Sequence, residues 1–483
     1  MEPDTSSARL FARNTAFLFL AQLLTKGLGF VSLILLANYL TVDHYGLYNF
    51  ALAFGTLFIP LFDLGMDTFL TREIAADPSA RERLSGNAII LKLGLSTLAV
   101  GVIIGVVALL PYDALKKPYV VMGGLIVVLR TLSITLHAMF RGDLRMGLEA
   151  NSTSVGKTIE LLVIIGAVLL RVSLASLFAI LFATTIVHLI YVVLLARHAH
   201  YRLAPALGLP VVRHLMQGGF PFALIGISVQ IYFQIATVML GVLAGDAAVG
   251  LYRAAYNLVF ALSAFSAAVA LSLFASVAHS YQSDRDKAIR ISSQAIAFSL
   301  VLALPAAVGG TILAPQIIGL LYPKEFAPAA ATLQILLWWL PFSFLTNLLG
   351  HMLGAINRQK LVLIVSVINA AVNVALNILL IPGFADRGAA TATVATEFVG
   401  FIILTVLVLR ALGHVYELSR IFRIVLSSAS LLPLLFLRDF LPVLANIAVG
   451  AALYSATLFT FKIVGRNEVR NMYAAVMGRL PSY

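Results

Sequence analysis

Cysteine is absent from this 483-residue chain, and charged residues are scarce. Without a thiol, the chain forms no disulfide, has no cysteine nucleophile and builds no thiolate metal site, and the redox state of its compartment leaves no mark on the sequence. Asp, Glu, Lys and Arg together make up 11% of the residues, whereas about 25% is usual in soluble domains. The composition therefore argues against a soluble protein.

Hydrophobic residues take the place of charge, at 61% of the chain. A helix needs about 20 apolar residues to cross the roughly 30 Å hydrocarbon layer of a membrane, and backbone groups in lipid must be hydrogen-bonded within their own segment. We therefore expect an all-α integral membrane protein with about fourteen transmembrane helices. They are expected at residues 14–40, 44–70, 87–110, 119–140, 151–170, 174–196, 216–242, 250–276, 290–314, 329–354, 361–381, 389–411, 421–437 and 441–464.

Lys and Arg are distributed unevenly between the connections. With the N-terminus on the cytoplasmic side, 23 of the 33 fall in inside segments. Six fall in outside connections: Lys116, Lys117, Arg171, Lys324, Arg387 and Arg438. The positive-inside rule then places both termini in the cytoplasm, in a multi-pass protein of the cytoplasmic (inner) membrane. The formal net charge of +12 is spread over short loops, which speaks against nucleic-acid binding.

Two parts of the chain resemble each other. Gly-Leu-Tyr at residues 46–48 follows an apolar run and an Asp, and so does Gly-Leu-Tyr at residues 250–252, at an offset of 204. A weaker match pairs His137 with His351, at an offset of 214. Six spans per copy give both copies the same orientation. Transporters built from two parallel bundles, related by an axis along the membrane normal, have this organisation and bind substrate at the repeat interface.

The repeat divides the chain into four predicted regions. An N-terminal six-helix lobe covers residues 1–200, and a C-terminal six-helix lobe covers residues 216–412. A cytoplasmic linker at residues 201–215 joins them. Residues 413–483 supply two extra transmembrane helices and a cytoplasmic tail. The two parallel lobes are expected to surround a central cavity.

The stretch from Arg13 to Ala75 carries a family resemblance. It contains a Leu/Ala-rich first helix, an outside turn that leads to Tyr45 and Gly46, an Asp-Leu-Gly run at residues 63–65, and then Arg-Glu at the inner surface. This pattern resembles the opening of the polysaccharide and O-antigen flippases of the multidrug/oligosaccharidyl-lipid/polysaccharide (MOP) exporter superfamily. The Gly-Leu-Tyr of the second half and the number of spans extend the resemblance over the whole chain.

The resemblance implies both a fold and a function. The implied fold is MATE-like: two six-helix lobes around a central cavity, with two C-terminal helices added. The implied function is transport of an oligosaccharide, linked to a polyprenyl pyrophosphate, from the inner to the outer leaflet by alternating access. Such transport serves surface polysaccharide biosynthesis, and a polysaccharide polymerase and a chain-length regulator are then candidate partners.

Cations within the spans are the first candidates to bind such a substrate. Lys26 lies near the middle of the first span, with Gln22 one turn earlier, and Arg130 lies midway along the fourth, with His137 a heptad later. Arg253 begins the eighth span. Charged groups at the bilayer centre are costly, so they usually face a cavity or a partner. We expect these residues to line the cavity and attract the pyrophosphate.

Acidic residues within the spans have two alternative roles. Asp63, Glu160 and Glu397 are candidates to carry a coupling ion, H⁺ or Na⁺, because intramembrane carboxylates often do so. Alternatively, each is a buried partner that neutralises a cation such as Lys26 or Arg130. Asp63 has a further alternative role in capping or packing a helix end. No cofactor is expected beyond the coupling ion.

Polar groups elsewhere in the spans are also ambiguous. Gln230 and Gln234 share one face of the seventh span, where their amides could bind sugar hydroxyls or hold packed helices together. Lys92 lies close enough to the inner end of the third span to extend to the interface. We expect it to act as an interfacial anchor.

An enzymatic function is not expected from this sequence. Acids in the outside connections occur one per short loop and never in pairs, and no loop has histidines at metal-ligand spacing. Two other transport functions remain as alternatives: a MATE-type multidrug or cation antiporter, and a flippase for the lipid-linked peptidoglycan precursor. Cation-extruding transporters favour acids in the cavity, whereas these span interiors contain Lys and Arg.

Overall fold

The computed structural model of the chain describes residues 24–109, 112–201 and 208–463. Over these residues the protein consists of helices joined by turns and contains no strand, which confirms the all-α class. Eleven helical segments among the described residues are long and apolar enough to cross a membrane. The chain is therefore a multi-pass membrane protein.

Two compact units make up the chain. The first contains Met1–Arg253 and Asn377–Asp386, and the second contains Ala254–Leu376 and Arg387–Tyr483. Helices α10 (Asp246–Ser283) and α14 (Gln359–Leu412) contribute to both units. The lobe boundaries at residues 200 and 216 rest on the sequence repeat and stay a prediction.

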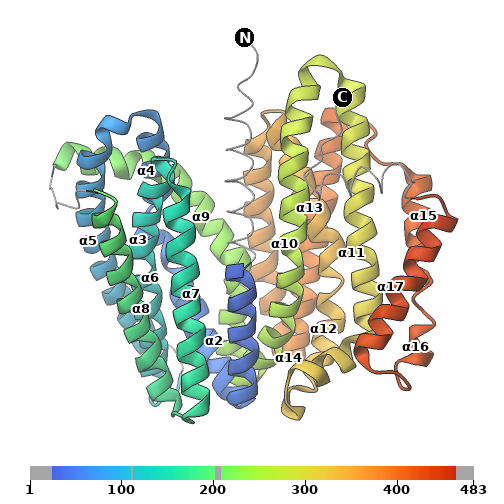
Figure 1. Cartoon of the computed structure of the whole chain (residues 1–483), viewed down its shortest axis with the longest axis horizontal. Coiled ribbons are helices and arrows are strands. Elements are labelled where there is room, and N and C mark those ends of the chain that lie inside the picture. The colour runs from blue at the N-terminus through green and yellow to red at the C-terminus, as the bar shows by residue number, and fades with distance from the viewer. Residues whose placement is uncertain (1–23, 110–111, 202–207, 464–483) are drawn as a thin grey trace. The chain divides into compact units, whose positions relative to one another are not determined.

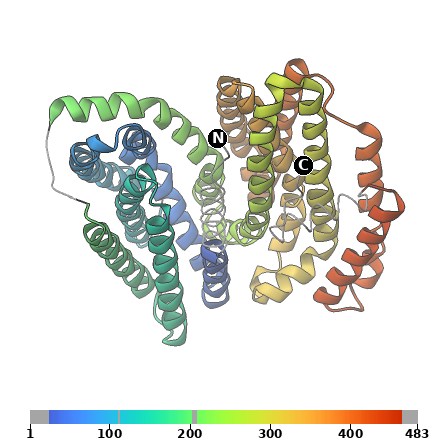
Figure 2. The ribbon, with the colours of Figure 1, turned by 45° about the horizontal axis from the view of Figure 1, so that its top comes forward.

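The long helices α5, α6, α7 and α8 of the first unit run alongside one another, whereas α9 runs obliquely to them (Figures 1 and 2). The central one is α6, which packs against α2, α4, α5 and α8. The elements are Leu24–Tyr39, α2 (Val42–Leu57), α3 (Ile59–Asp63), α4 (Met66–Ala76), the 3-10 turn η1 (Pro78–Ala80), α5 (Arg81–Leu109), α6 (Lys117–Gly142), α7 (Met146–Leu169), α8 (Leu174–His198) and α9 (Leu209–Leu243).

Short polar residues set several helix starts. The Thr41 hydroxyl accepts a hydrogen bond from the backbone N–H of His44 and caps α2, and Ser173 caps α8 in the same way. An N-cap oxygen satisfies a donor that has no partner inside the helix. These caps fix where the helices begin.

The predicted second span, residues 44–70, is broken rather than continuous. Leu64 and Gly65 both adopt the left-handed conformation, with φ of 47° and 70°, and separate α3 from α4. A Cβ on Gly65 would lie 2.1 Å from the carbonyl oxygen of Gly219 on α9. Glycine is therefore required here both for the backbone conformation and for the close approach of α9. Across the break, Asp63 accepts a hydrogen bond from the backbone N–H of Asp67.

The second unit contains the remaining helices (Figure 1). Trp338 separates the two parts of the span predicted at 329–354, and Ala385 (φ 47°) interrupts α14 between the two spans predicted at 361–381 and 389–411. The elements are the later part of α10, α11 (Arg285–Leu321), the 3-10 turn η2 (Lys324–Phe326), α12 (Ala329–Leu336), α13 (Trp339–Ala355), most of α14, α15 (Leu418–Ala429), α16 (Leu434–Leu437) and α17 (Val443–Thr460).

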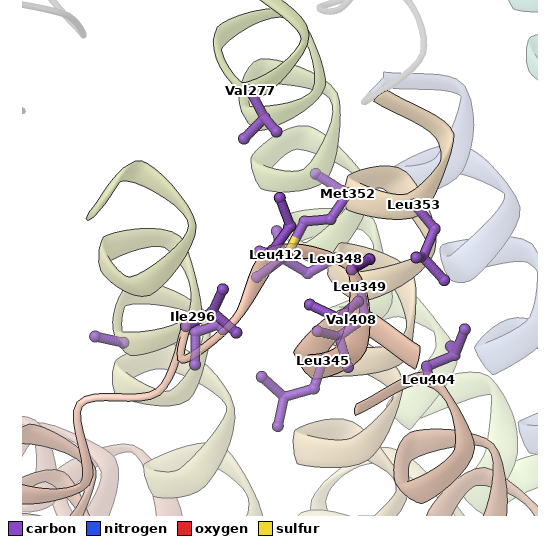
Figure 3. Packing of buried hydrophobic residues seen from close by; sticks show 14 of the residues in the cluster. Val277, Ile296, Leu345, Leu348, Leu349, Met352, Leu353, Leu404, Val408 and Leu412 are labelled. Carbon is purple, nitrogen blue, oxygen red and sulfur yellow. The ribbon is translucent and has the colours of Figure 1, made fainter. Parts of the chain in front are cut away.

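Five helices, α10, α11, α13, α14 and α15, contribute to a hydrophobic cluster of the second unit. Val277 of α10, Ile296 of α11, Leu349 of α13 and Val408 of α14 belong to it (Figure 3). The C-terminal helices α15 and α17 pack on α11 beside a smaller cluster that includes Tyr454. Because lipid is as apolar as Leu, close packing rather than exclusion from water holds such helices together.

The two Gly-Leu-Tyr copies touch each other. A Cβ on Gly46 would lie 1.8 Å from the carbonyl oxygen of Asp246, and one on Gly250 would lie 2.3 Å from that of Val42. At the offset of 204, residues 42 and 46 correspond to 246 and 250, so one contact is made twice, reciprocally. Reciprocal contacts are the property of two elements related by a two-fold axis. The geometry therefore supports the register inferred from the sequence.

Candidate functional site

Three charged side chains, Arg130, Lys157 and Glu160, form a cluster in the first unit that we name the cation cluster. The Arg130 guanidinium on α6 lies 3.4 Å from Glu160 Oε2 on α7, and Lys157 Nζ lies 2.9 Å from the same oxygen. The Arg130 and Lys157 side chains are 34% and 31% exposed, and that of Glu160 is 16% exposed. Two cations thus share one carboxylate, which gives the cluster an excess of positive charge.

Arg130 is predicted from the sequence either to line a cavity or to pair with an acid. The structure shows the pair with Glu160, in which the guanidinium remains partly exposed. An arginine has five N–H donors, and one carboxylate that is also shared with Lys157 cannot satisfy them all. Arg130 therefore retains the capacity to bind a further anion.

Arg253 lies in the same region of the unit. Its Nε donates a long hydrogen bond of 3.4 Å to Asn49 Oδ1, and Asn49 is its counterpart in the repeat. The buried Tyr48 lies within electrostatic range of Arg130, Glu160 and Arg253. Arg253 and its counterpart in the repeat thus meet within the first unit.

His137 is buried and hydrogen-bonded rather than open. Its Nε2 lies 2.9 Å from the hydroxyl of Ser152 on α7, which also lies 3.4 Å from Nε2 of His188 on α8. The two imidazole rings are 6.5 Å apart between centroids. One hydroxyl therefore links two histidines on different helices.

Lys92 is not an interfacial anchor, and that prediction is wrong. Its side chain is 1% exposed, and its Nζ lies 2.8 Å from Asp63 and 3.1 Å from Asp67. The helix break at Leu64–Gly65 places both carboxylates against α5, where they bind the ammonium group. Asp63 thus combines a capping hydrogen bond with an ion pair, and its role in ion coupling stays a prediction.

Four other predicted site residues lie on other helices than the cation cluster or outside the described residues. Lys26 is exposed on the helix Leu24–Tyr39, and Gln22 lies outside the described residues. Gln230 is half-buried on α9. Gln234, also on α9, has a buried Oε1 without a hydrogen-bond partner. The substrate-binding roles of these four residues stay predictions.

Glu397 is buried in the second unit. Its carboxylate accepts hydrogen bonds from Trp339 Nε1, at 3.2 Å, and from the Thr346 hydroxyl. Neutral donors around a carboxylate fit a site that can hold either a proton or an ion. The coupling role of Glu397 stays a prediction.

A polar contact also joins two segments of the first unit that are far apart in the sequence. Lys116 and Tyr112, in the connection between α5 and α6, both donate hydrogen bonds to the carboxylate of Asp246. The hydrogen bond to Asp246 raises the pKa of Lys116, and burial together with this carboxylate raises the pKa of Tyr112. The contact ties the α5–α6 connection to the start of α10.

An open groove of about 630 Å³ lies on the second unit. Trp338, Phe342 and Phe398 give it aromatic walls, and Arg387 contributes a charged group to its lining. The lining is otherwise mostly apolar.

Sequence reasoning missed Ser152, Gly156, Lys157 and His188. A usable signal is present, because Ser152, Gly156 and Glu160 recur every four residues and therefore lie on one face of α7. Small and polar residues on one face of a membrane helix mark a contact with another helix. The sequence does not indicate that His188 of α8 meets that face.

Comparisons with known families agree with this architecture. Residues 11–275 match the family described as "Polysaccharide biosynthesis protein", and residues 221–379 match the family described as "MatE". The first match covers more than half of the chain. The two matches overlap at the start of the second repeat.

Two relatives come from Haloferax volcanii. The "Probable low-salt glycan biosynthesis flippase Agl15" is 26% identical to this chain over 397 residues, which cover 79% of this chain and 80% of the relative. The "Probable flippase AglR" is 24% identical over 257 residues, which cover 51% of this chain and 54% of the relative.

Solved structures show the same fold. "Lipid II flippase MurJ, inward closed conformation" superposes with a TM-score of 0.68 at 16% identity, over 96% of this chain and 99% of that one. An inward-facing multidrug resistance MATE family transporter superposes with a TM-score of 0.66 at 12% identity, over 81% and 95%. The expected MATE-like fold is confirmed, whereas the fourteen spans and the central cavity stay predictions. By its matched residues, the chain belongs to the polysaccharide biosynthesis protein family.

Proposed function

We propose that this protein is a flippase that moves an oligosaccharide, linked to a polyprenyl pyrophosphate, from the inner to the outer leaflet by alternating access. Its family and its flippase relatives support this function. The observation that carries it is the cation cluster, in which two cations share one carboxylate inside membrane-spanning helices.

The physical argument concerns the charge of the cargo. A pyrophosphate head group must leave water to cross the membrane, and a charge within the bilayer is stabilised only by a partner. Arg130 matches phosphate oxygens with paired N–H donors, and Lys157 adds a point charge. When the head group binds, the excess positive charge of the cluster becomes compensated. The cluster thus favours an anion over a cation.

Glycan export in a flippase-deficient strain tests this proposal. We expect the wild-type protein to restore export, and Arg130→Ala and Lys26→Ala to abolish it at near-normal protein levels. Lys324→Ala, which removes an exposed cation outside the described spans, serves as the control and should export normally. Full export by both Arg130→Ala and Lys26→Ala would contradict the electrostatic mechanism.

A MATE-type drug antiporter is the second candidate, favoured by the match of residues 221–379. Cationic drugs would be repelled by the cation cluster, and the repulsion grows as water is excluded. We therefore expect no rise in resistance to cationic dyes on expression. Dye resistance without glycan export would contradict the proposed flippase function and support the antiporter function.

We further propose the cellular setting. Both termini lie on the cytoplasmic side of the inner membrane, and the protein acts without a catalytic step, beside a polysaccharide polymerase and a chain-length regulator. The coupling ion in this proposal is H⁺ or Na⁺, bound at Glu160, Glu397 or Asp63, and transport driven by the membrane potential alone is the alternative. Glu160→Gln and Glu397→Gln are the tests: unchanged dependence of export on external pH and Na⁺ in both variants would exclude these two residues.

A further inference from the structure

One face of α7 carries a row of three residues, of which the proposed function involves only Glu160. Ser152, Gly156 and Glu160 follow one another at intervals of four, about 6 Å apart along the helix axis. His188 of α8 lies against this face, and His137 of α6 reaches it from the other side. Three helices of the first unit thus bring two imidazoles and a carboxylate together.

The hydrogen bonds of His188 determine which of its ring nitrogens carries a proton. Nε2 of His188 is 3.2 Å from the backbone carbonyl oxygen of Ser152 and 3.4 Å from its hydroxyl. A carbonyl oxygen only accepts, so this nitrogen carries a proton. The hydroxyl accepts from His188 and also lies 2.9 Å from Nε2 of His137, which donates to it or accepts from it according to the tautomer of that ring. Each of these hydrogen bonds forms while both rings are neutral.

Gly156 makes the room that His188 needs. A Cβ at this position would lie 2.6 Å from Nε2 of His188 and 2.6 Å from its Cδ2. Real Cβ atoms do not approach other atoms so closely, so an alanine here would push the ring away. The absence of a side chain at residue 156 therefore allows the imidazole to contact the α7 backbone beside Ser152.

The charges around His188 come from both helices that pack on α8. Arg130 on α6 and Lys157 and Glu160 on α7 act on it directly. Arg141 on α6 acts on His137, and Glu149 on α7 lies 3.6 Å from Arg141. His188 therefore lies between the cation cluster and a second ion pair near the ends of α6 and α7.

We propose that His188, with Ser152 and His137, forms a proton-binding site coupled to the cation cluster, so that a proton and the anionic head group are taken up together. This inference rests on the proposed function, because it names the ion that the same site uses. Histidine is the side chain whose charge changes most readily near neutral pH.

The coupling follows from the sharing of Glu160. With His188 neutral, Glu160 is shared by Arg130 and Lys157. The ring of His188 lies against Gly156, one helical turn from Glu160, so a proton on it adds a third cation near the same carboxylate. The added charge weakens the hold of Glu160 on Arg130 and increases the excess positive charge. Both effects favour an incoming anion. By linkage, the bound anion must favour the protonated imidazole equally.

Binding of farnesyl pyrophosphate to the purified full-length protein in nanodiscs, by calorimetry at pH 6 and pH 8, tests this site. When the pH falls from 8 to 6, we expect the affinity of the wild-type protein for the probe to rise about tenfold more than the affinity of His188→Gln. An effect of this size is within the usual range of allosteric coupling. A glutamine retains an N–H donor for Ser152 and so preserves the packing. The phosphate groups of farnesyl pyrophosphate change protonation with pH in the same way in every experiment. A difference in pH dependence between variants therefore comes from the protein.

Two further variants make the test specific. Gly156→Ala displaces the ring of His188 and should lose the same pH dependence, whereas His44→Gln, at an exposed histidine near the start of α2, should behave as wild type. Retention of the wild-type pH dependence by both His188→Gln and Gly156→Ala overturns this inference alone. Wild-type protein that fails to bind the probe, or Arg130→Gln that binds it normally, overturns the proposed function as well.

Discussion

At the scale of single residues, the buried ion cluster of Lys92, Asp63 and Asp67 is the strongest structural constraint in the first unit. One ammonium group lies between two carboxylates, at 2.8 and 3.1 Å, with almost no exposure. Removing one partner of a buried ion pair leaves an uncompensated charge, which costs about 3–5 kcal/mol. The cluster therefore requires its cation.

The expected consequence of Lys92→Met is a loss of stability of about 3–5 kcal/mol. The two carboxylates would then face each other without a cation. The thermal unfolding midpoint in detergent measures the effect, and Lys324→Met, at an exposed lysine, is the matched control. A triple variant that adds Asp63→Asn and Asp67→Asn should recover most of the loss, because the amide introduced at position 63 keeps an oxygen to cap α4. A stable single variant would show that the ion pairs contribute little.

The cation cluster around Glu160 differs from the Lys92 cluster in its balance of charge. In the Lys92 cluster the carboxylates outnumber the cation, whereas in the cation cluster two cations share one acid. The cation of the first cluster is buried, whereas both cations of the second are partly exposed. A buried cluster serves structure, while a half-exposed one with spare positive charge can bind an anion.

At the scale of the elements, backbone contacts through glycine determine how helices meet. Gly46 and Gly250 bring the starts of α2 and α10 together, and Gly65 lets α9 reach the break between α3 and α4. Small residues allow membrane helices to approach closely, so that van der Waals contacts replace the missing hydrophobic effect. The first unit depends on such approaches.

Alanine at Gly46 should separate α2 from α10. Its Cβ would lie 1.8 Å from the carbonyl oxygen of Asp246, and a backbone atom cannot move aside as a side-chain tip can. We expect Gly46→Ala and Gly250→Ala each to lower the unfolding midpoint and to reduce glycan export. Gly101→Ala on α5, where the added methyl meets open space, should be neutral or slightly stabilising, since Ala favours helix by about 1 kcal/mol. Equal effects at all three positions would refute the packing argument.

At the scale of the whole molecule, the distribution of Lys and Arg predicts the topology. The chain contains no cysteine, so single cysteines report accessibility without any background. Leu115→Cys and Glu325→Cys should react with a membrane-impermeant maleimide in intact cells. Arg83→Cys and Arg197→Cys should react only after permeabilisation. Labelling of position 197 from outside would reverse the orientation and, with it, the direction of transport that we propose.

Much of the fold can be predicted from the sequence, and the site only in part. Arg130, His137 and Glu160 stand out because a charged or ionisable residue in an apolar run is conspicuous. The prediction for Lys92 fails because the sequence does not show that a helix break after Asp63 turns two carboxylates toward it. His188 escapes notice because one histidine in a long apolar helix has no pattern of its own.

The all-α class, the membrane-spanning character and the family follow from the amino-acid order alone. They depend on the length of apolar runs and on short motifs, which are local and add up along the chain. Which charges meet is settled instead by the packing of the folded chain, because Arg130 and Glu160, or Ser152 and His188, are far apart in the sequence and on different helices. Their contact depends on how each helix is rotated about its axis, and that rotation is set by close packing, including the missing side chain at Gly156.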